Sequence, residues 1–256
     1  MAYGMIVFMA SRVSGTNVFR SLSKQLTFSD EDIVGAEAFE DEDAKYIDSA
    51  RIEHLENLML PIDGKRVLDV GCGVGHWSDF FLNKNCALVS VDARPENINI
   101  FRSHHPSTES HVLNVETTSL SPLGFFDIVF CYGLFYHLEN PVMALRNMAA
   151  VCKEMLLLET LVMDYNLPLS RVVNESLSAN QALRGIGHRP TPSYVVFLLN
   201  KEGFEKIYTP KMPPCHPDFT FEWRNNMDTT RDGNNLRCIF VASKNKLENE
   251  NLTNIL

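Results

Sequence analysis

The stretch V-L-D-V-G-C-G-V-G at Val67–Gly75 decides the fold of this chain. Arg66–Val70 has the composition of a short buried strand, and Trp77–Asn83 carries apolar residues at helical spacing. The three glycines between them let the backbone turn sharply off the strand and approach a ligand closely. The following helix would direct its unpaired N-terminal amides at that ligand. The stretch therefore predicts a strand–loop–helix ligand site.

The loop departs from the dinucleotide-binding pattern G-x-G-x-x-G. That pattern requires its third glycine at position 76, where this chain has His76. Asp69, two residues before the first glycine, is also foreign to it. The spacing therefore disfavours an NAD-dependent oxidoreductase.

Outward from the loop, short apolar runs alternate with segments of helical period. We expect strands at 66–70, 87–91, 111–115, 127–131 and 155–160, and helices at 77–83, 96–103 and 141–151. A further helix is expected at 193–200, and further strands at 205–209 and 236–242. This alternation predicts an α/β fold with an open, mostly parallel sheet and helices on both faces.

We expect one domain. Residues 1–60 would form an N-terminal arm and a helical lid, with eight acids within positions 30–43 and a helix over 44–59. Residues 61–160 would form a cofactor-binding half, and 161–256 a substrate-shaping half. In the second half, insertions at 164–192 and 210–235 show no clear strand, and the Asn-rich tail from residue 245 is expected to fray.

Composition restricts the classes of partner. The formal charge is 23 − 32 = −9, which argues against the broad basic surface that nucleic acid requires. The six cysteines form no C-x-x-C pair, so we expect neither a metal site nor a disulfide framework. The sequence contains no run of eighteen apolar residues, so it predicts no helix that spans a membrane. These features indicate a cytoplasmic protein with no metal.

The glycine loop resembles motif I, D/E-x-G-x-G-x-G, of class I S-adenosylmethionine (SAM)-dependent methyltransferases, with Asp69, Gly71, Gly73 and Gly75 in the matching positions. Further motifs follow in the family's order over about residues 60–160. The resemblance implies a Rossmann-like methyltransferase fold with seven strands, the last antiparallel, and SAM as cofactor.

The same resemblance implies the cofactor contacts. Asp92 matches the acid that accepts hydrogen bonds from the ribose hydroxyls, and Asn114 stands where the family often has an acid facing adenine. Arg51 would either hold the SAM carboxylate or lie on a solvated helix face. The implied cofactor residues are Asp69, Gly71, Cys72, Gly73, Asp92, Ala93, Asn114, Val115, Glu116, Cys131 and Tyr132.

Phe126–Pro141 contains Y-H-L-E-N-P, similar to the L-x-Y-H-L-x-x-P segment of relatives that methylate small molecules or tRNA. By that likeness Tyr136 and His137 would face the acceptor. His137 is the candidate general base, because imidazole titrates near neutral pH; a structural role is the alternative. Glu159, at the end of an expected strand, would point into the crevice and bind hydroxyls, share the base role or pair with Arg171.

His188 and His216, one in each insertion, are candidate substrate-binding residues. Together these features predict methyl transfer to a small-molecule or sugar/glycan acceptor, at oxygen, by in-line displacement with a general base. An RNA (tRNA)-modifying methyltransferase and a non-catalytic SAM-binding module are the alternatives.

Overall fold

The computed structural model describes residues 42–178 and 180–256. The expectations for the arm at 1–26 and for the acidic positions 30–41 therefore lie outside the described residues. Residues 42 and 43 open helix α2 (Glu42–Asn57), where their carboxylates favour the positive end of the helix dipole.

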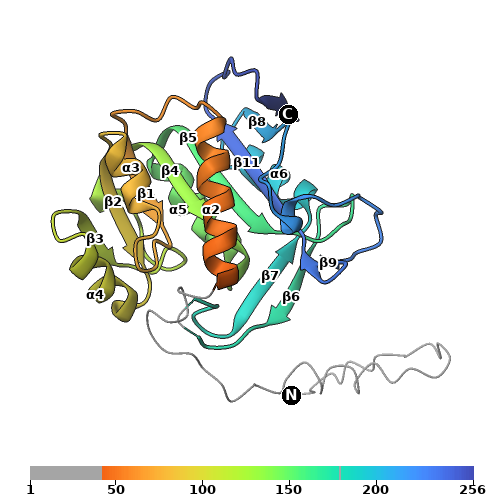
Figure 1. The fold of residues 1–256 in the computed structure, drawn as a ribbon, viewed down its shortest axis with the longest axis horizontal. Coiled ribbons are helices and arrows are strands. Elements are labelled where there is room, and N and C mark those ends of the chain that lie inside the picture. The colour runs from red at the N-terminus through yellow and green to blue at the C-terminus, as the bar shows by residue number, and fades with distance from the viewer. Residues whose placement is uncertain (1–41, 179) are drawn as a thin grey trace, which may run out of the picture.

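The described residues form an eight-stranded main sheet in the order β12-β8-β11-β5-β4-β1-β2-β3. The five strands from β3 to β5 run parallel, and β11 is antiparallel to both β5 and β8 (Figure 1). The expected parallel core and antiparallel late strand are thus confirmed. The strands are β1 (Arg66–Val70), β2 (Ala87–Asp92), β3 (Glu109–Val112), β4 (Phe126–Tyr132), β5 (Cys152–Leu161), β8 (Lys206–Pro210), β11 (Arg237–Ser243) and β12 (Leu252–Asn254).

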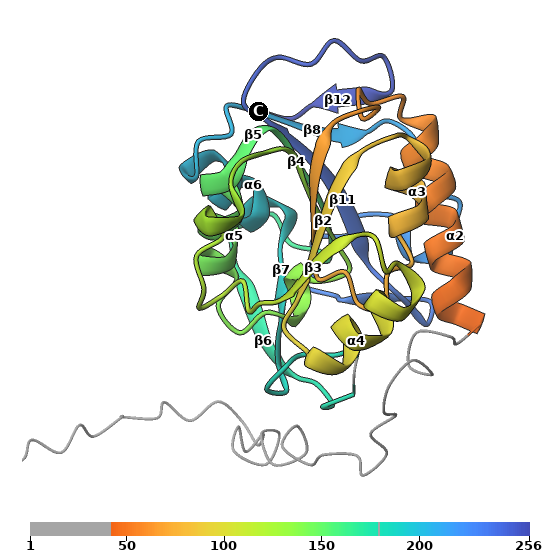
Figure 2. The same ribbon diagram turned by 90° about the vertical axis from the view of Figure 1, so that its left-hand side faces the viewer.

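Helices cover both faces of this sheet (Figure 2). On one face α2 and α3 (Ser78–Asn83) enclose an apolar core, and on the other α5 (Pro141–Val151) and α6 (Pro192–Lys201) enclose a second. Helix α4 (Pro95–His104) packs against β2 and β3. Within the part of the chain that is described, none of the helices has the length and apolar character needed to cross a membrane.

The local sequence explains these elements. In β5 the run Leu156–Leu158 is fully buried, as expected for a central strand covered on both faces. Helix α5 begins at Pro141 after Asn140, whose side chain accepts from the Met143 amide, and α6 begins in the same way after Thr191. The expected helices and strands of residues 61–160 are confirmed, with ends shifted by a few residues.

The expectation that the two insertions of the second half lack strands is wrong. The insertion 164–192 contains an antiparallel hairpin of β6 (Ser170–Asn174) and β7 (Ile186–Pro190), separate from the main sheet (Figure 1). The insertion 210–235 contains the two short strands β9 (Thr230–Arg231) and β10 (Asn234–Asn235).

The C-terminal tail forms the eighth strand, β12, where seven strands and a frayed end were expected. Two of its asparagines fix it to the end of helix α2. The Asn249 side chain donates to the Leu58 carbonyl at 2.8 Å, and the Asn251 side chain donates to the Asn57 carbonyl at 3.2 Å. The asparagine-rich composition thus supplies hydrogen bonds that hold the tail.

Candidate functional site

A crevice opens beyond the carboxyl ends of β1, β2 and β4, the usual ligand position in an open parallel sheet. It has two halves, and six residues line both of them: Gly71, Gly73, Gly133, His137, Asn180 and Gln181. The apolar half has a volume of about 690 Å³ and the polar half about 1460 Å³, and both volumes include space that is open to solvent. The apolar half is lined by Val91, Leu113, Leu134, Leu138 and Leu183 with Asp92, and the polar half by Tyr46, Asp48, His76, His216, Asn235 and Arg237.

The glycine loop forms the wall between β1 and the crevice. The amides of Gly71 and Cys72 both donate to the Val91 carbonyl, at 2.8 and 3.1 Å, and so fix the loop to β2. Gly71 has a φ of +79°, and a Cβ there would lie 2.8 Å from the Leu134 side chain. Only glycine therefore fits, and backbone lines both halves of the crevice.

Asp92 presents a carboxylate at the end of β2. It accepts from the amides of Gly73 at 3.1 Å and Arg94 at 2.8 Å, and from the Asn97 side chain at 3.2 Å. Burial raises its pKa although these hydrogen bonds act in the opposite direction. Asp92 lines the apolar half and, when ionised, can accept bonds from ligand hydroxyls.

The expected adenine-side residues Ala93, Asn114, Val115 and Glu116 all line the apolar half. The Asn114 side-chain carbonyl accepts from the Glu116 amide at 2.8 Å, and the Glu116 carboxylate accepts from the Asn140 amide. Both side chains therefore shape the wall through local bonds. A carbonyl oxygen has a second lone pair, so Asn114 can still accept from a ligand.

Asp69 and Cys131, expected at the cofactor, line neither half. Asp69 is 2% exposed, and one of its carboxyl oxygens has no hydrogen-bond partner within residues 42–178 and 180–256. Burial, together with the negative charge of Asp92, raises its pKa to about 8. Cys72 lines the polar half, and burial raises its thiol pKa, so it remains a protonated packing residue.

Tyr132, at the end of β4, lines the polar half as expected. Its ring stacks on Phe130 with centroids 4.4 Å apart, and among the described residues its buried hydroxyl has no hydrogen-bond partner. A buried unpaired hydroxyl is costly, so it is available to a polar atom of a ligand.

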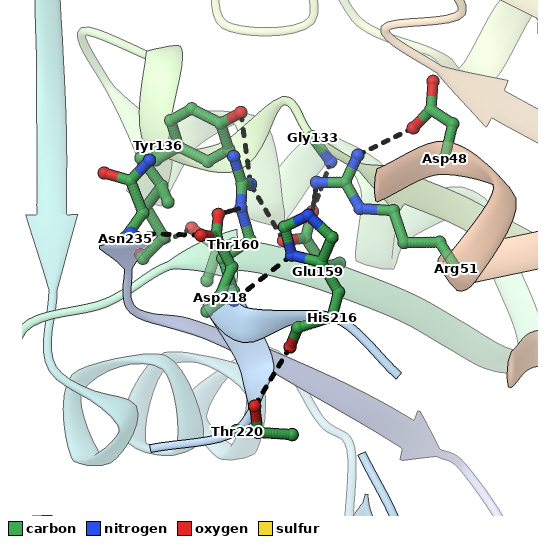
Figure 3. A network of polar contacts seen from close by, with 12 residues as sticks. Asp48, Arg51, Gly133, Tyr136, Glu159, Thr160, His216, Asp218, Thr220 and Asn235 are labelled. Atoms are coloured by element: carbon green, nitrogen blue, oxygen red, sulfur yellow. Dashed lines mark hydrogen bonds and ion pairs between the residues drawn. The ribbon is translucent and has the colours of Figure 1, made fainter. Parts of the chain in front are cut away.

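Glu159 on β5 is fully buried at the centre of a charged network (Figure 3). Its carboxylate accepts from Arg51 at 2.8 Å, from the Gly133 amide at 2.9 Å and from Arg237 at 3.0 Å. Burial alone would raise its pKa, but Arg51 and Arg237 hold that pKa below its usual value. The expectation that Glu159 points into the crevice is wrong, because the two arginines use its oxygens.

The proposed pairing of Glu159 with Arg171 is also wrong, since Arg171 donates to the Thr229 hydroxyl at 3.0 Å. Arg51, for which a solvated helix face was one alternative, is only 6% exposed. It bridges Glu159 to Asp48, 2.8 Å away on the same helix. The network therefore anchors helix α2 to the sheet.

Arg237, the first residue of β11, extends this network to the polar half, which it lines. It donates to Asp218 at 2.9 Å and to the Tyr136 hydroxyl at 3.4 Å. Asp218 in turn accepts from the Asn235 amide at 3.1 Å. The sequence prediction missed Arg237, although a charged residue within the apolar run L-R-C-I-F-V-A was a usable signal.

The histidines differ in position. His216 lines the polar half, where its ring contacts that of Tyr46 with centroids 4.7 Å apart. His188 lies on β7 and bonds the Ser170 hydroxyl at 3.1 Å, and it lines neither half. The structure therefore brings His216, but not His188, to the crevice.

His137 lies where the two halves meet, in the 3₁₀ turn Phe135–His137 together with Tyr136. Its Nδ1 bonds the carboxylate of Glu175, a residue of the first insertion that sequence reasoning did not single out. Burial lowers the His137 pKa, although the Glu175 carboxylate favours the charged ring. The imidazole is therefore neutral near pH 7 and can accept a proton.

A family model described as "Methyltransferase domain" matches residues 44–208. Among curated proteins, the tRNA U34 carboxymethyltransferase of Syntrophotalea carbinolica is 28% identical over 58% of this chain and 47% of its own length. The ubiquinone biosynthesis O-methyltransferase of Bordetella avium is 30% identical over 42% of this chain and 46% of its own length. The chain thus spans about half the length of the curated relatives it matches.

Among solved structures, the N-terminal domain of EvdMO1, crystallised in the presence of SAH and D-fucose, superposes with a TM-score of 0.60. The match covers 91% of this chain and 99% of that domain, at 17% sequence identity. At this level of identity the likeness shows a shared fold.

Proposed function

This chain belongs to the class I methyltransferase-domain family, and we propose that it transfers a methyl group from SAM to a hydroxyl of a small, polar acceptor of sugar or glycan type. The observation that carries this proposal is the position of His137. A neutral imidazole lies where an apolar half that suits a nucleoside meets a polar half that suits a hydroxylated molecule.

The residues of the apolar half fit SAM. Asp92 would accept from the ribose hydroxyls, and the leucines of the wall would hold the adenine ring. The loop of Gly71 and Gly73 and the unpaired Tyr132 hydroxyl would hold the methionine end. When bound, SAM supplies a methyl group activated by its sulfonium.

The remaining chemistry belongs to the protein. The crevice must align the acceptor hydroxyl, and a base must remove its proton as the oxygen–carbon bond forms. His137 would take that proton on Nε2, because its Nδ1 is engaged by Glu175.

The polar half favours an uncharged, hydroxyl-rich acceptor. Its wall offers hydrogen-bonding groups from Tyr46, His216 and Asn235. Its two arginines are paired within the protein, Arg51 with Asp48 and Glu159, and Arg237 with Asp218 and Glu159. Because their charge is compensated, they offer little attraction to a phosphate backbone, which disfavours RNA.

We also propose that the chain acts as one domain. The glycine loop and Asp92 come from residues 61–160. Asp218 and Arg237 come from residues 161–256 and line the same crevice, and Glu175 from that half binds His137 behind its wall. All six cysteines are free thiols, which supports a reducing, cytoplasmic location.

The test is transfer of tritium from methyl-labelled SAM by the purified protein. Pools of monosaccharides, nucleotide sugars and oligosaccharides form one arm, phenolic metabolites a second and total tRNA a third. Label in the sugar pool that disappears with His137→Ala supports the proposal. Salt-sensitive label in tRNA would replace it with RNA modification. Tight SAM binding without transfer in any arm would favour a non-catalytic module.

A further inference from the structure

We propose that Glu175 is a positioning residue that fixes the proton of the neutral His137 ring on Nδ1 and so leaves Nε2 as the proton acceptor. The proposal rests on the function proposed above, in which His137 is the base. It deepens that function, because it assigns part of the base's action to a residue of the first insertion.

The Glu175 carboxylate lies in a built pocket. It follows strand β6, is 7% exposed, and accepts from His137 Nδ1, from Arg189 at 2.9 Å and from the Ala182 amide at 3.2 Å. A Cβ placed at Gly187 would overlap this carboxylate, so the pocket exists only because β7 has glycine there. The carboxylate is thus held from three sides.

An ionised carboxylate accepts hydrogen bonds and donates none. Burial alone would raise the Glu175 pKa, but His137 and Arg189 hold that pKa below its usual value, so Glu175 is ionised at neutral pH. The ring nitrogen that faces it must therefore carry the proton, and the lone pair of the neutral ring must lie on Nε2.

Burial keeps the His137 ring neutral while Glu175 orients it. Glu175 favours the imidazolium, whereas Arg189 and Arg237 disfavour it. Both guanidinium groups also lie over the Tyr136 ring, at 5.5 and 5.2 Å from its centroid, beside the imidazole. Because burial, with help from the two cations, outweighs the attraction of the carboxylate for a proton, Glu175 can hold the ring without trapping a proton on it.

The carboxylate is also tied to the wall of the apolar half. The oxygen that binds His137 accepts from the Ala182 amide, and the neighbours Gln181 and Leu183 line that half. Arg94 donates to the carbonyls of Gln181 and Ala182 at 3.4 and 3.3 Å. Rotation of Glu175 away from His137 would therefore cost a second hydrogen bond, which restricts the orientation of the ring.

The test is nitrogen-15 NMR of the full chain with labelled histidine, without SAM or acceptor, titrated from pH 5 to 8. His137 is assigned as the signal that His137→Ala removes. We expect the proton of the neutral ring on Nδ1 in the unaltered protein. In Glu175→Gln we expect the His137 pKa to fall further, because a negative charge is lost, and the proton to lose its strict preference for Nδ1, because an amide can donate to that nitrogen as well as accept from it. Glu202→Gln is the matched control, since Glu202 pairs with Arg146 at 3.1 Å away from the crevice, and it should leave both quantities unchanged.

A proton on Nε2 in the unaltered protein overturns the proposal without any variant, even if Glu175→Gln fails to fold. Unchanged tautomer and pKa in a folded Glu175→Gln variant overturn it as well. Because no methyl transfer is measured, failure here is distinct from failure of the proposed reaction.

Discussion

Arg51 of helix α2 and Glu159 of strand β5 lie 108 positions apart in sequence and form a buried hydrogen-bonded ion pair at 2.8 Å (Figure 3). The same Glu159 oxygen accepts from the amide of Gly133, which lines both halves of the crevice. The pair therefore joins the helix beside the crevice to the backbone of its floor.

Arg51→Met should destabilise the fold strongly. It leaves the fully buried Glu159 charge with fewer partners, and breaking a buried pair by removing one member costs about 3–5 kcal/mol. Lys65→Met is the control, because the Lys65–Glu154 pair has the same 2.8 Å length but lies partly exposed, and should cost below about 1 kcal/mol. Urea unfolding of both variants measures the difference. An equal loss in the free energy of unfolding for both variants would contradict the role of Arg51 as a buried anchor of helix α2.

Asp92→Asn should weaken SAM binding about 10- to 100-fold, since hydrogen bonds to a charged group are worth about 1.5–3 kcal/mol. Asp127→Asn is a matched control. Asp127 likewise accepts a backbone amide, that of Arg66 at 2.9 Å, but at the amino-terminal end of the parallel strands and away from the crevice. Calorimetric titration with SAM reports both affinities. The assignment of Asp92 fails if the two variants bind SAM equally well.

The fold of residues 61–160 could be predicted because its information is local. Each central strand is a continuous apolar run such as Leu156–Leu158, and the glycine loop marks the first turn. The hairpin β6–β7 escaped prediction because its two strands pair with each other outside the main sheet, and exposed apolar residues such as Val172 give no clear alternation. Strand β12 has only three residues and depends on distant partners.

The residues of the candidate site also fall into two groups, those in local sequence motifs and those whose position depends on distant partners. Asp92 and His137 belong to local motifs, and both line the crevice. Glu159 was misassigned because a position at a strand's end predicts the edge of the sheet but not the partners of the side chain. Those partners, Arg51 and Arg237, lie 108 and 78 positions away, and Glu175 lies 38 positions from His137. Such long-range pairings have no signature in a single sequence.

His137→Ala should lower the turnover of the accepted acceptor by about 10²–10⁴-fold, the usual contribution of a general base. In the unaltered enzyme the rate should rise with pH through a pKa below 6.5 and then level, because the neutral ring is the active form and burial lowers its pKa. Tritium transfer as a function of pH measures both effects. His188→Ala is the control, since His188 bonds Ser170 away from the crevice, and it should retain near-normal turnover. An unchanged rate in His137→Ala would return His137 to a structural role.

Asp69 should make the fold less stable as pH rises. Burial holds the proton on its carboxyl to a pKa of about 8 in the folded chain, against an ordinary pKa of 3.8, so the folded state binds more protons between those two pH values. Stability from this group is present below about pH 4 and is lost progressively toward pH 8, by up to about 1.4 kcal/mol per pH unit. Asp69→Asn removes this titration. The free energy of unfolding of the variant, measured in urea, should therefore increasingly exceed that of the unaltered protein from pH 5.5 to 7.5. Asp127→Asn should show no such trend, because the Arg66 amide holds the Asp127 pKa below its usual value and that carboxyl is ionised throughout this range. If the free energies of unfolding of Asp69→Asn and of the unaltered protein changed in parallel with pH, Asp69 would already be ionised beneath the loop.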